Sequence, residues 1–190
     1  MSVTRSGPYH QTRSGRVWYP YSPRPEDVFR EDLLALGNVC RFGGHVMPGC
    51  WYSNLDHSLR VAELLESWGE PSSVLLEGLA HDLHEAYPPH DQLSPVIRCQ
   101  SQFATEARAM SRKAASAVRI ALGLPEHLSP AVKRADAILL ATERRDLMAP
   151  SVECEWGPLP DPLPTQIRPY SIAVVETLWR RLWAKHGGTW

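Results

Sequence analysis

The segment 79–87 carries the side chains best suited to chemistry. At about 100° per residue, a helix would place His81, Asp82 and Glu85 on one arc, opposite an apolar arc. A solvent-exposed helix face usually carries lysine–glutamate pairs four residues apart, whereas this face has no lysine. Acceptor groups crowded in this way repel one another unless a cation lies between them. The segment therefore predicts half of a metal site inside a helix.

Two further residues could complete that site. His57 falls in the first turn of a predicted helix that opens with the capping box Ser53-x-x-Asp56, and it shares a face with apolar residues. Taken alone, His57 could equally be a hydrogen-bonded core histidine. Asp136 lies on the apolar flank of another predicted helix, where an acid is costly unless it is paired or binds a metal. Two nitrogens and two carboxylates suit one divalent Zn, Mn, Co, Fe or Ni ion per site.

Candidate phosphate contacts lie in and around the segment Arg41-Phe42-Gly43-Gly44-His45. Arg41 offers a permanently charged fork for bidentate hydrogen bonds, although it could also be an ordinary surface arginine. Lys133 and Arg98 are weaker candidates for neutralising phosphate, with a solvated surface position as the alternative. Three histidines could contact substrate or have structural or surface roles: His45, His84 and His90.

The order of these motifs resembles the HD superfamily of metal-dependent phosphohydrolases. The motifs are Arg-Phe-Gly-Gly-His, Asp-His-Ser, His-Asp-x-His-Glu-Ala and Lys-Arg-Ala-Asp, and the resemblance spans roughly residues 29–145. The chain is similar in particular to the small bacterial 5′-deoxyribonucleotidases and to related phage enzymes, which include dATP triphosphohydrolases. The resemblance implies an all-α fold, a single HD-domain bundle of about six to seven helices.

The resemblance also implies roles for individual residues. The metal ligands would be His57, His81, Asp82 and Asp136. Glu85 matches the residue that positions or activates the attacking water, so Glu85 and Asp82 are the catalytic candidates. Arg41 and Phe42 match an arginine–aromatic pair that holds the phosphate or sugar of a nucleotide and packs by the base. Asp91 resembles an aspartate near the sugar and leaving group, but it lies one residue later than in the family pattern. Phe42 stands where the bacterial nucleotidases have tryptophan, so base and sugar selectivity do not carry over.

The implied reaction is metal-dependent hydrolysis of a deoxynucleotide phosphate. The substrate would be a dNTP, including a dATP-like one, or a dNMP, and a second divalent ion could accompany the substrate phosphates. The alternatives are an alarmone or cyclic-nucleotide phosphodiesterase and a nucleotide-sensing HD module without catalysis. The intact Glu85 speaks against the sensing module, because a degenerate site is free to lose its water-positioning acid.

Composition limits the partners. The 190 residues are 43% hydrophobic without a composition break, which predicts one domain over residues 1–190. A net charge of −1 gives no global positive field, so nucleic-acid polymers and membrane surfaces are not expected partners. The four cysteines lack C-x-x-C spacing and no stretch approaches the roughly 18 apolar residues of a membrane span. These features predict a soluble cytoplasmic protein, and the resemblance implies the cytoplasm of a bacterium or of a phage-infected host.

Helical periodicity predicts the elements that must position the site. We expect helices over 25–39, 53–68, 71–87, 101–122, 129–149 and 165–187, and a proline-rich connection over 150–164. Residues 1–25 predict an irregular aromatic arm whose Trp18 could reach the substrate, or whose rings could simply pack on the core. The last helix has a wide apolar face, which predicts packing on the bundle or on another subunit and hence a homo-oligomer.

Overall fold

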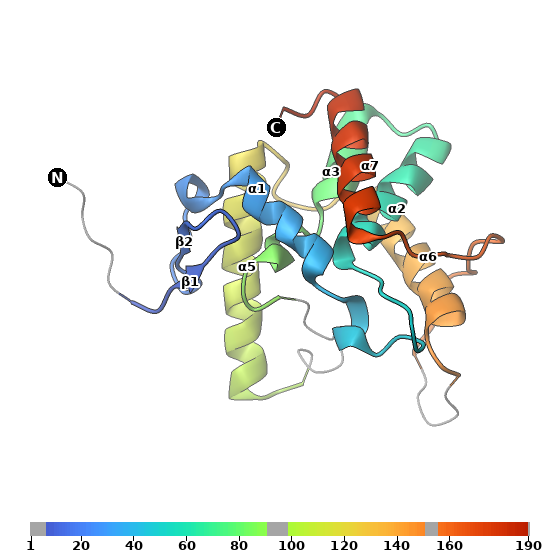
Figure 1. Cartoon of the computed structure of the whole chain (residues 1–190), viewed down its shortest axis with the longest axis horizontal. Helices are drawn as coiled ribbons and strands as arrows, with labels where there is room; N and C mark the ends of the chain where they lie inside the picture. The colour runs from blue at the N-terminus through green and yellow to red at the C-terminus, as the bar shows by residue number, and fades with distance from the viewer. Residues whose placement is uncertain (1–6, 91–98, 151–155, 190) are drawn as a thin grey trace.

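Three of the longer helices of the computed structural model pack around α2 (Asn54–Ser67) (Figure 1). The structure describes residues 7–90, 99–150 and 156–189. The other longer helices are α3 (Ser72–Ala80), α5 (Gln102–Leu122), α6 (Pro130–Leu147) and α7 (Ile172–Lys185). Helix α2 contacts α3, α6 and α7, whereas α5 packs on the segment that follows α3. The predicted all-α class is confirmed, and no helix of the described residues is long and apolar enough to cross a membrane.

Short elements precede α2. They are β1 (His10–Gln11), β2 (Val17–Trp18), η1 (Pro25–Asp27), α1 (Arg30–Leu33), η2 (Leu34–Asn38) and η3 (Arg41–Gly44). The prediction of one helix over 25–39 is wrong, because Val28 and Phe29 adopt extended backbone between η1 and α1. The buried Asp32 then accepts hydrogen bonds from the backbone N–H and the hydroxyl of Ser14, at 2.6 and 2.9 Å. A long-range contact therefore ties this segment to the N-terminal hairpin.

Trp18 anchors the N-terminal arm in the core. The arm is not wholly irregular, because β1 and β2 pair as a small antiparallel hairpin. The Trp18 side chain is 0% exposed and stacks on Tyr87, with ring centroids 3.8 Å apart. The ring is thus enclosed by the protein itself. The structure gives no support for Trp18 as a substrate contact and corrects that expectation to core packing.

The C-terminal helix begins later than predicted and packs on its own chain. Residues 156–171 form neither helix nor strand, and Arg145 of α6 donates hydrogen bonds to the carbonyls of Leu163 and Thr165 in this segment. Pro169 disfavours a helical residue before it, so α7 starts at Ile172 instead of residue 165. Its apolar face, which includes Val175, Trp179 and Trp183, is buried against the bundle. That face therefore lends no support to a second subunit, and the homo-oligomer stays a prediction.

Trp179 links α7 to the last turn of α3. Its indole Nε1–H donates a hydrogen bond to the carbonyl of Leu79, at 3.1 Å, in a fully buried position. Trp179→Phe removes this donor, and we expect the free energy of unfolding to fall by about 1–3 kcal/mol. Urea unfolding followed by circular dichroism measures the loss, which should not depend on protein concentration because the contact lies within one chain.

Trp51→Phe is the matched control for this change. The Trp51 side chain is 44% exposed, so its replacement should alter stability by less than about 0.5 kcal/mol. Equal losses for the two variants would contradict the role given to the Trp179 hydrogen bond.

Candidate metal centre

Helix α3 ends at the residues that carry the chemistry. It stops at Ala80, Asp82 has the non-helical angles φ −109° and ψ 6°, and the short turn η4 (Leu83–Ala86) follows. The prediction that His81 and Asp82 lie inside a longer helix is therefore wrong. The break matters because His81 Nδ1 lies 2.7 Å from the Gly78 carbonyl, which can only accept a hydrogen bond. In the neutral imidazole Nδ1 therefore carries the proton, which leaves the lone pair on Nε2 for a metal.

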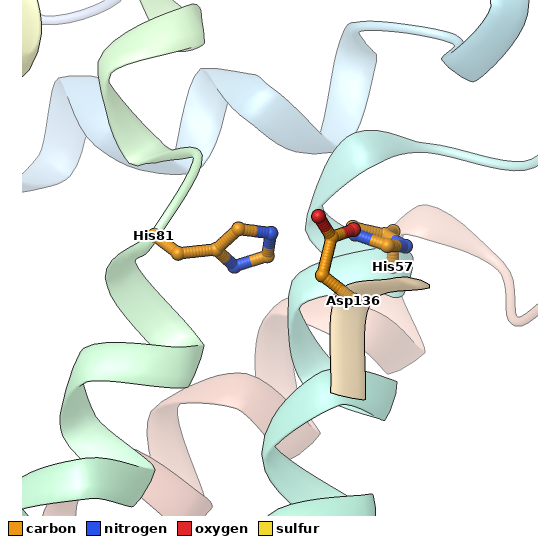
Figure 2. A group of neighbouring side chains, drawn as sticks. All are labelled: His57, His81 and Asp136. Carbon is orange, nitrogen blue, oxygen red and sulfur yellow. The ribbon is translucent and has the colours of Figure 1, made fainter. Parts of the chain in front are cut away.

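Three of the predicted ligands converge from different helices. His57 comes from the first turn of α2, His81 from the end of α3 and Asp136 from α6, and their side chains point toward one another (Figure 2). One ligand atom from each lies within 4.8 Å of the others. The fourth predicted ligand, Asp82, places Oδ2 3.1 Å from His81 Nε2 and 4.0 Å from His57 Nε2. The structure thus brings together all four residues.

The chemistry of this donor set fits a divalent cation. His57 Nε2 and His81 Nε2 are buried and have no hydrogen-bond partner. A carboxylate oxygen lies 3.1 Å from each of them, from Asp136 and Asp82 respectively. That spacing is close to the edge of an octahedron with metal–ligand bonds of about 2.1 Å, which is roughly 3 Å. Buried polar atoms are costly without a partner, and a shared cation would satisfy both nitrogens at once.

The electrostatics of the centre favour ionised carboxylates. Burial alone would raise the pKa of Asp82, but His81, His57 and Arg41 outweigh it and leave this pKa well below its usual range. The pKa of Asp136 is likewise lowered, because its contact with His57 outweighs its burial. Burial would lower the pKa of His81, but the adjacent Asp82 raises it to about 9. The carboxylates thus hold positive charge at this position, as they would hold a cation.

Arg41, the first residue of η3, also lies beside the centre. Its Nη1 lies 3.9 Å from Asp82 Oδ2, and its Nη2 lies 3.9 Å from Asp136 Oδ1. The next residue, Phe42, has φ 58°, a left-handed conformation that is rare for a bulky side chain. Its ring is 8% exposed and meets Trp156 edge to face, with centroids 6.0 Å apart. The structure therefore places Arg41 at the predicted ligands and Phe42 just beside it, covered by Trp156.

Glu85 lies in the turn that follows the break in α3. Its Oε2 accepts a hydrogen bond of 2.7 Å from Asn54 Nδ2, at the start of α2. The contact links the two segments that supply His57 and His81. It also orients the Glu85 carboxylate, which is partly buried.

The remaining candidates lie in varied settings. His45 and Lys133 are exposed. His84 is partly buried, its Nε2 lies 3.3 Å from Ser111 Oγ, and its pKa is lowered mainly by burial. His90 is exposed and its Nδ1 contacts the backbone carbonyl of Glu85. Asp91 and Arg98 lie outside the described residues, so their expected roles stay predictions.

Sequence reasoning gave no role to Glu143, which belongs to this centre. Glu143 is 0% exposed and accepts hydrogen bonds from His57 Nδ1, Arg41 Nε and the hydroxyl of Tyr52. Burial would raise its pKa, but Arg41, His57 and these hydrogen bonds outweigh that effect and lower it. The available signal was its position seven residues after Asp136, two helical turns along the same face. Asn54 was also missed, because a helix N-terminal asparagine ordinarily indicates only a cap.

Comparisons with known proteins agree with this geometry. The family model for the HD domain matches residues 54–155, which contain all four candidate ligands. The chain is also similar to the Escherichia coli (strain K12) protein YfdR, itself described as uncharacterized. The two are 35% identical over 138 residues, covering 72% of this chain and 71% of YfdR. HD domains bind divalent metals and act as metal-dependent phosphohydrolases. The chain belongs to the HD-domain family.

Proposed function

We propose that the chain hydrolyses deoxynucleotide phosphates in a metal-dependent reaction, acting on dNTPs or on dNMPs. The observation that carries the proposal is the position of Arg41, whose guanidinium lies 3.9 Å from the carboxylates of both Asp82 and Asp136. A permanent cation beside a metal-binding cluster suits an anionic phosphoryl group held between the two. Phe42 follows Arg41 and its ring contacts the partly exposed Trp156, which adds aromatic surface of the kind that packs against a base.

In this proposal, different residues bind the metal, bind the phosphate and accept a proton. His57, His81, Asp82 and Asp136 would hold the cation. When bound, a divalent ion lowers the pKa of water and withdraws charge from a phosphoryl oxygen. Arg41 binds and orients the phosphate through its Nη1 and Nη2 groups. Glu85, oriented by Asn54, accepts a proton from the attacking water.

A panel of nucleotides tests the proposal. Purified protein loaded with Mn²⁺ or Co²⁺ is incubated with dNMPs, dNTPs, their ribose counterparts, cyclic nucleotides and an alarmone. We expect metal-dependent cleavage of deoxynucleotides. Release of phosphate from a dNMP identifies a 5′-nucleotidase, release of tripolyphosphate from a dNTP identifies a triphosphohydrolase, and release of pyrophosphate from a dNTP identifies cleavage between the α- and β-phosphates.

Two outcomes of the panel would contradict the proposal. Nucleotide binding without any product would favour a sensing module, and cleavage confined to cyclic nucleotides or the alarmone would favour a phosphodiesterase of that class. A metal-loaded protein that turns over none of the panel would remove the support for deoxynucleotide hydrolysis altogether.

A further inference from the structure

Glu143 connects two parts of the centre through one buried carboxylate. Its Oε1 accepts hydrogen bonds from His57 Nδ1, at 2.5 Å, and from the Tyr52 hydroxyl, at 2.8 Å. Its Oε2 accepts a hydrogen bond of 2.7 Å from Arg41 Nε. A fully buried carboxylate is costly unless its charge and its oxygens are both satisfied. Here one oxygen is used by the predicted metal ligand and the other by the predicted phosphate-binding arginine.

The contact on Oε1 fixes the orientation of His57. An ionised carboxylate only accepts hydrogen bonds, so the proton of the neutral imidazole must sit on Nδ1. The lone pair is then on Nε2, which is fully buried, has no hydrogen-bond partner and faces Asp136 Oδ1 at 3.1 Å. A histidine that ligates a metal commonly donates its other N–H to a carboxylate, which fixes the ring and makes the ligand more basic. Glu143 occupies that position for His57.

The contact on Oε2 fixes the orientation of Arg41. A guanidinium is planar, so holding its Nε sets the directions of Nη1 and Nη2. These two nitrogens lie 3.9 Å from Asp82 Oδ2 and Asp136 Oδ1, which is too long for hydrogen bonds. Their donors are therefore directed at the centre without being used up by the two carboxylates. A phosphoryl oxygen is the kind of acceptor that could use them.

We infer that Glu143 is a positioning residue shared by the metal subsite and the phosphate subsite, holding His57 toward the cation through Oε1 and Arg41 toward phosphate through Oε2. The phosphate half of the inference rests on the proposed function, whereas the metal half rests only on the ligand cluster. Loss of the one carboxylate should therefore weaken two binding events that involve different residues.

Glu77 provides the comparison for a purely structural carboxylate. It is 3% exposed and accepts a hydrogen bond from the backbone N–H of Ser129, at the start of α6, and it pairs with Arg119. It therefore also joins separate helices, but it contacts none of the predicted ligands in the described residues. A carboxylate that only stabilised the fold should behave as Glu77 does.

The test compares Glu143→Gln, Glu77→Gln and Arg41→Gln in the full chain. Glutamine keeps the shape of glutamate but is neutral and has one acceptor oxygen in place of two. One of the two partners, His57 or Arg41, therefore loses its acceptor, and the other loses the negative charge with which it is paired. Calorimetry first measures the Kd for Mn²⁺ without substrate. It then measures the Kd for inorganic phosphate at saturating Mn²⁺. Neither measurement requires turnover.

We expect Glu143→Gln to raise the Kd for Mn²⁺ by about 10- to 100-fold. It should also raise the Kd for phosphate by about tenfold or more, as expected for a lost charge-assisted contact. Arg41→Gln should raise only the Kd for phosphate, and Glu77→Gln should change both constants by less than about threefold. If Glu143→Gln does not fold, Glu143→Asp, which withdraws the carboxylate by one methylene, should show the same two losses.

Several results would overturn the inference. Unchanged Mn²⁺ binding in the Glu143 variants would do so, as would an equal loss in Glu77→Gln. Weaker Mn²⁺ binding with unaltered phosphate binding would overturn the shared role. Failure of the proposed function gives a different pattern, in which wild-type protein binds Mn²⁺ and phosphate but cleaves no nucleotide.

Discussion

Asp82→Ala is expected to abolish phosphate release and to strip the protein of its divalent metal. The carboxylate lies 3.1 Å from His81 Nε2 and 4.0 Å from His57 Nε2, so its loss removes both an oxygen donor and a negative charge. A bound cation contributes several kcal/mol to transition-state stabilisation, which corresponds to a loss of at least about 10³-fold in rate. Product release and elemental analysis of the purified variant measure the two effects.

Asp161→Ala is the control for this substitution. Asp161 is an exposed acid in the irregular connection before α7, and its loss should leave both rate and metal content unchanged. Wild-type turnover in Asp82→Ala would show that the reaction does not depend on this cluster. A loss of turnover at full metal content would instead remove Asp82 from the ligand set and leave it a role in the reaction itself.

Glu85→Gln is expected to separate catalysis from metal binding. The amide preserves size and can still meet Asn54, but it cannot accept a proton from water. We expect kcat to fall by about 10²- to 10⁴-fold, the usual contribution of a general base. Metal content should be retained, because Glu85 is not among the predicted ligands. Steady-state kinetics and elemental analysis on the same preparation provide the measurement.

The exposed Glu126 supplies a matched glutamate-to-glutamine control, and Glu126→Gln should behave as wild type. Full activity in Glu85→Gln would show that another group accepts the proton. Loss of metal in this variant would mean that Glu85 is a ligand, and the assignment of roles would have to be revised.

The helices with local end signals were predictable from the sequence. Helix α5 starts after Ser101, whose side chain caps it, and it ends at Gly123 in the left-handed conformation. Helix α6 starts after Ser129, which also caps it. These signals lie within a few residues of the helix ends, so no knowledge of the rest of the fold is needed to find them.

Other boundaries depend on contacts that the sequence does not display. The start of α7 was placed seven residues too early, because Ile167 and Tyr170 make contacts that the sequence does not reveal. In the structure their backbone N–H groups donate to Asp146 and Asp56, residues of α6 and α2. The break after α3 is similar, because its last turn is met by Trp179 from α7, one hundred residues away in sequence.

Some residues of the site could likewise be predicted from the sequence, and others could not. His57, His81, Asp82 and Asp136 could be predicted because each lies in a short motif and their order is informative. Glu143 could not, because its partners depend on how α6 lies against α2 and on the turn that contains Arg41. For Trp18 the sequence left core packing and a substrate contact both open for a related reason, since aromatic composition does not distinguish a ring that packs on Tyr87 from one that meets a ligand.

The ligands come from α2, the end of α3 and α6, and this distribution ties the energetics of folding to the free concentration of metal. An unfolded chain would not hold the four side chains together, so a cation that binds them binds mainly the folded state. Its contribution to stability would follow mass action and reach about 2.7 kcal/mol when free metal is 100 times the dissociation constant. A chelator would then act on the fold as well as on the reaction, and a cell short of the metal would hold a less stable protein as well as a less active one.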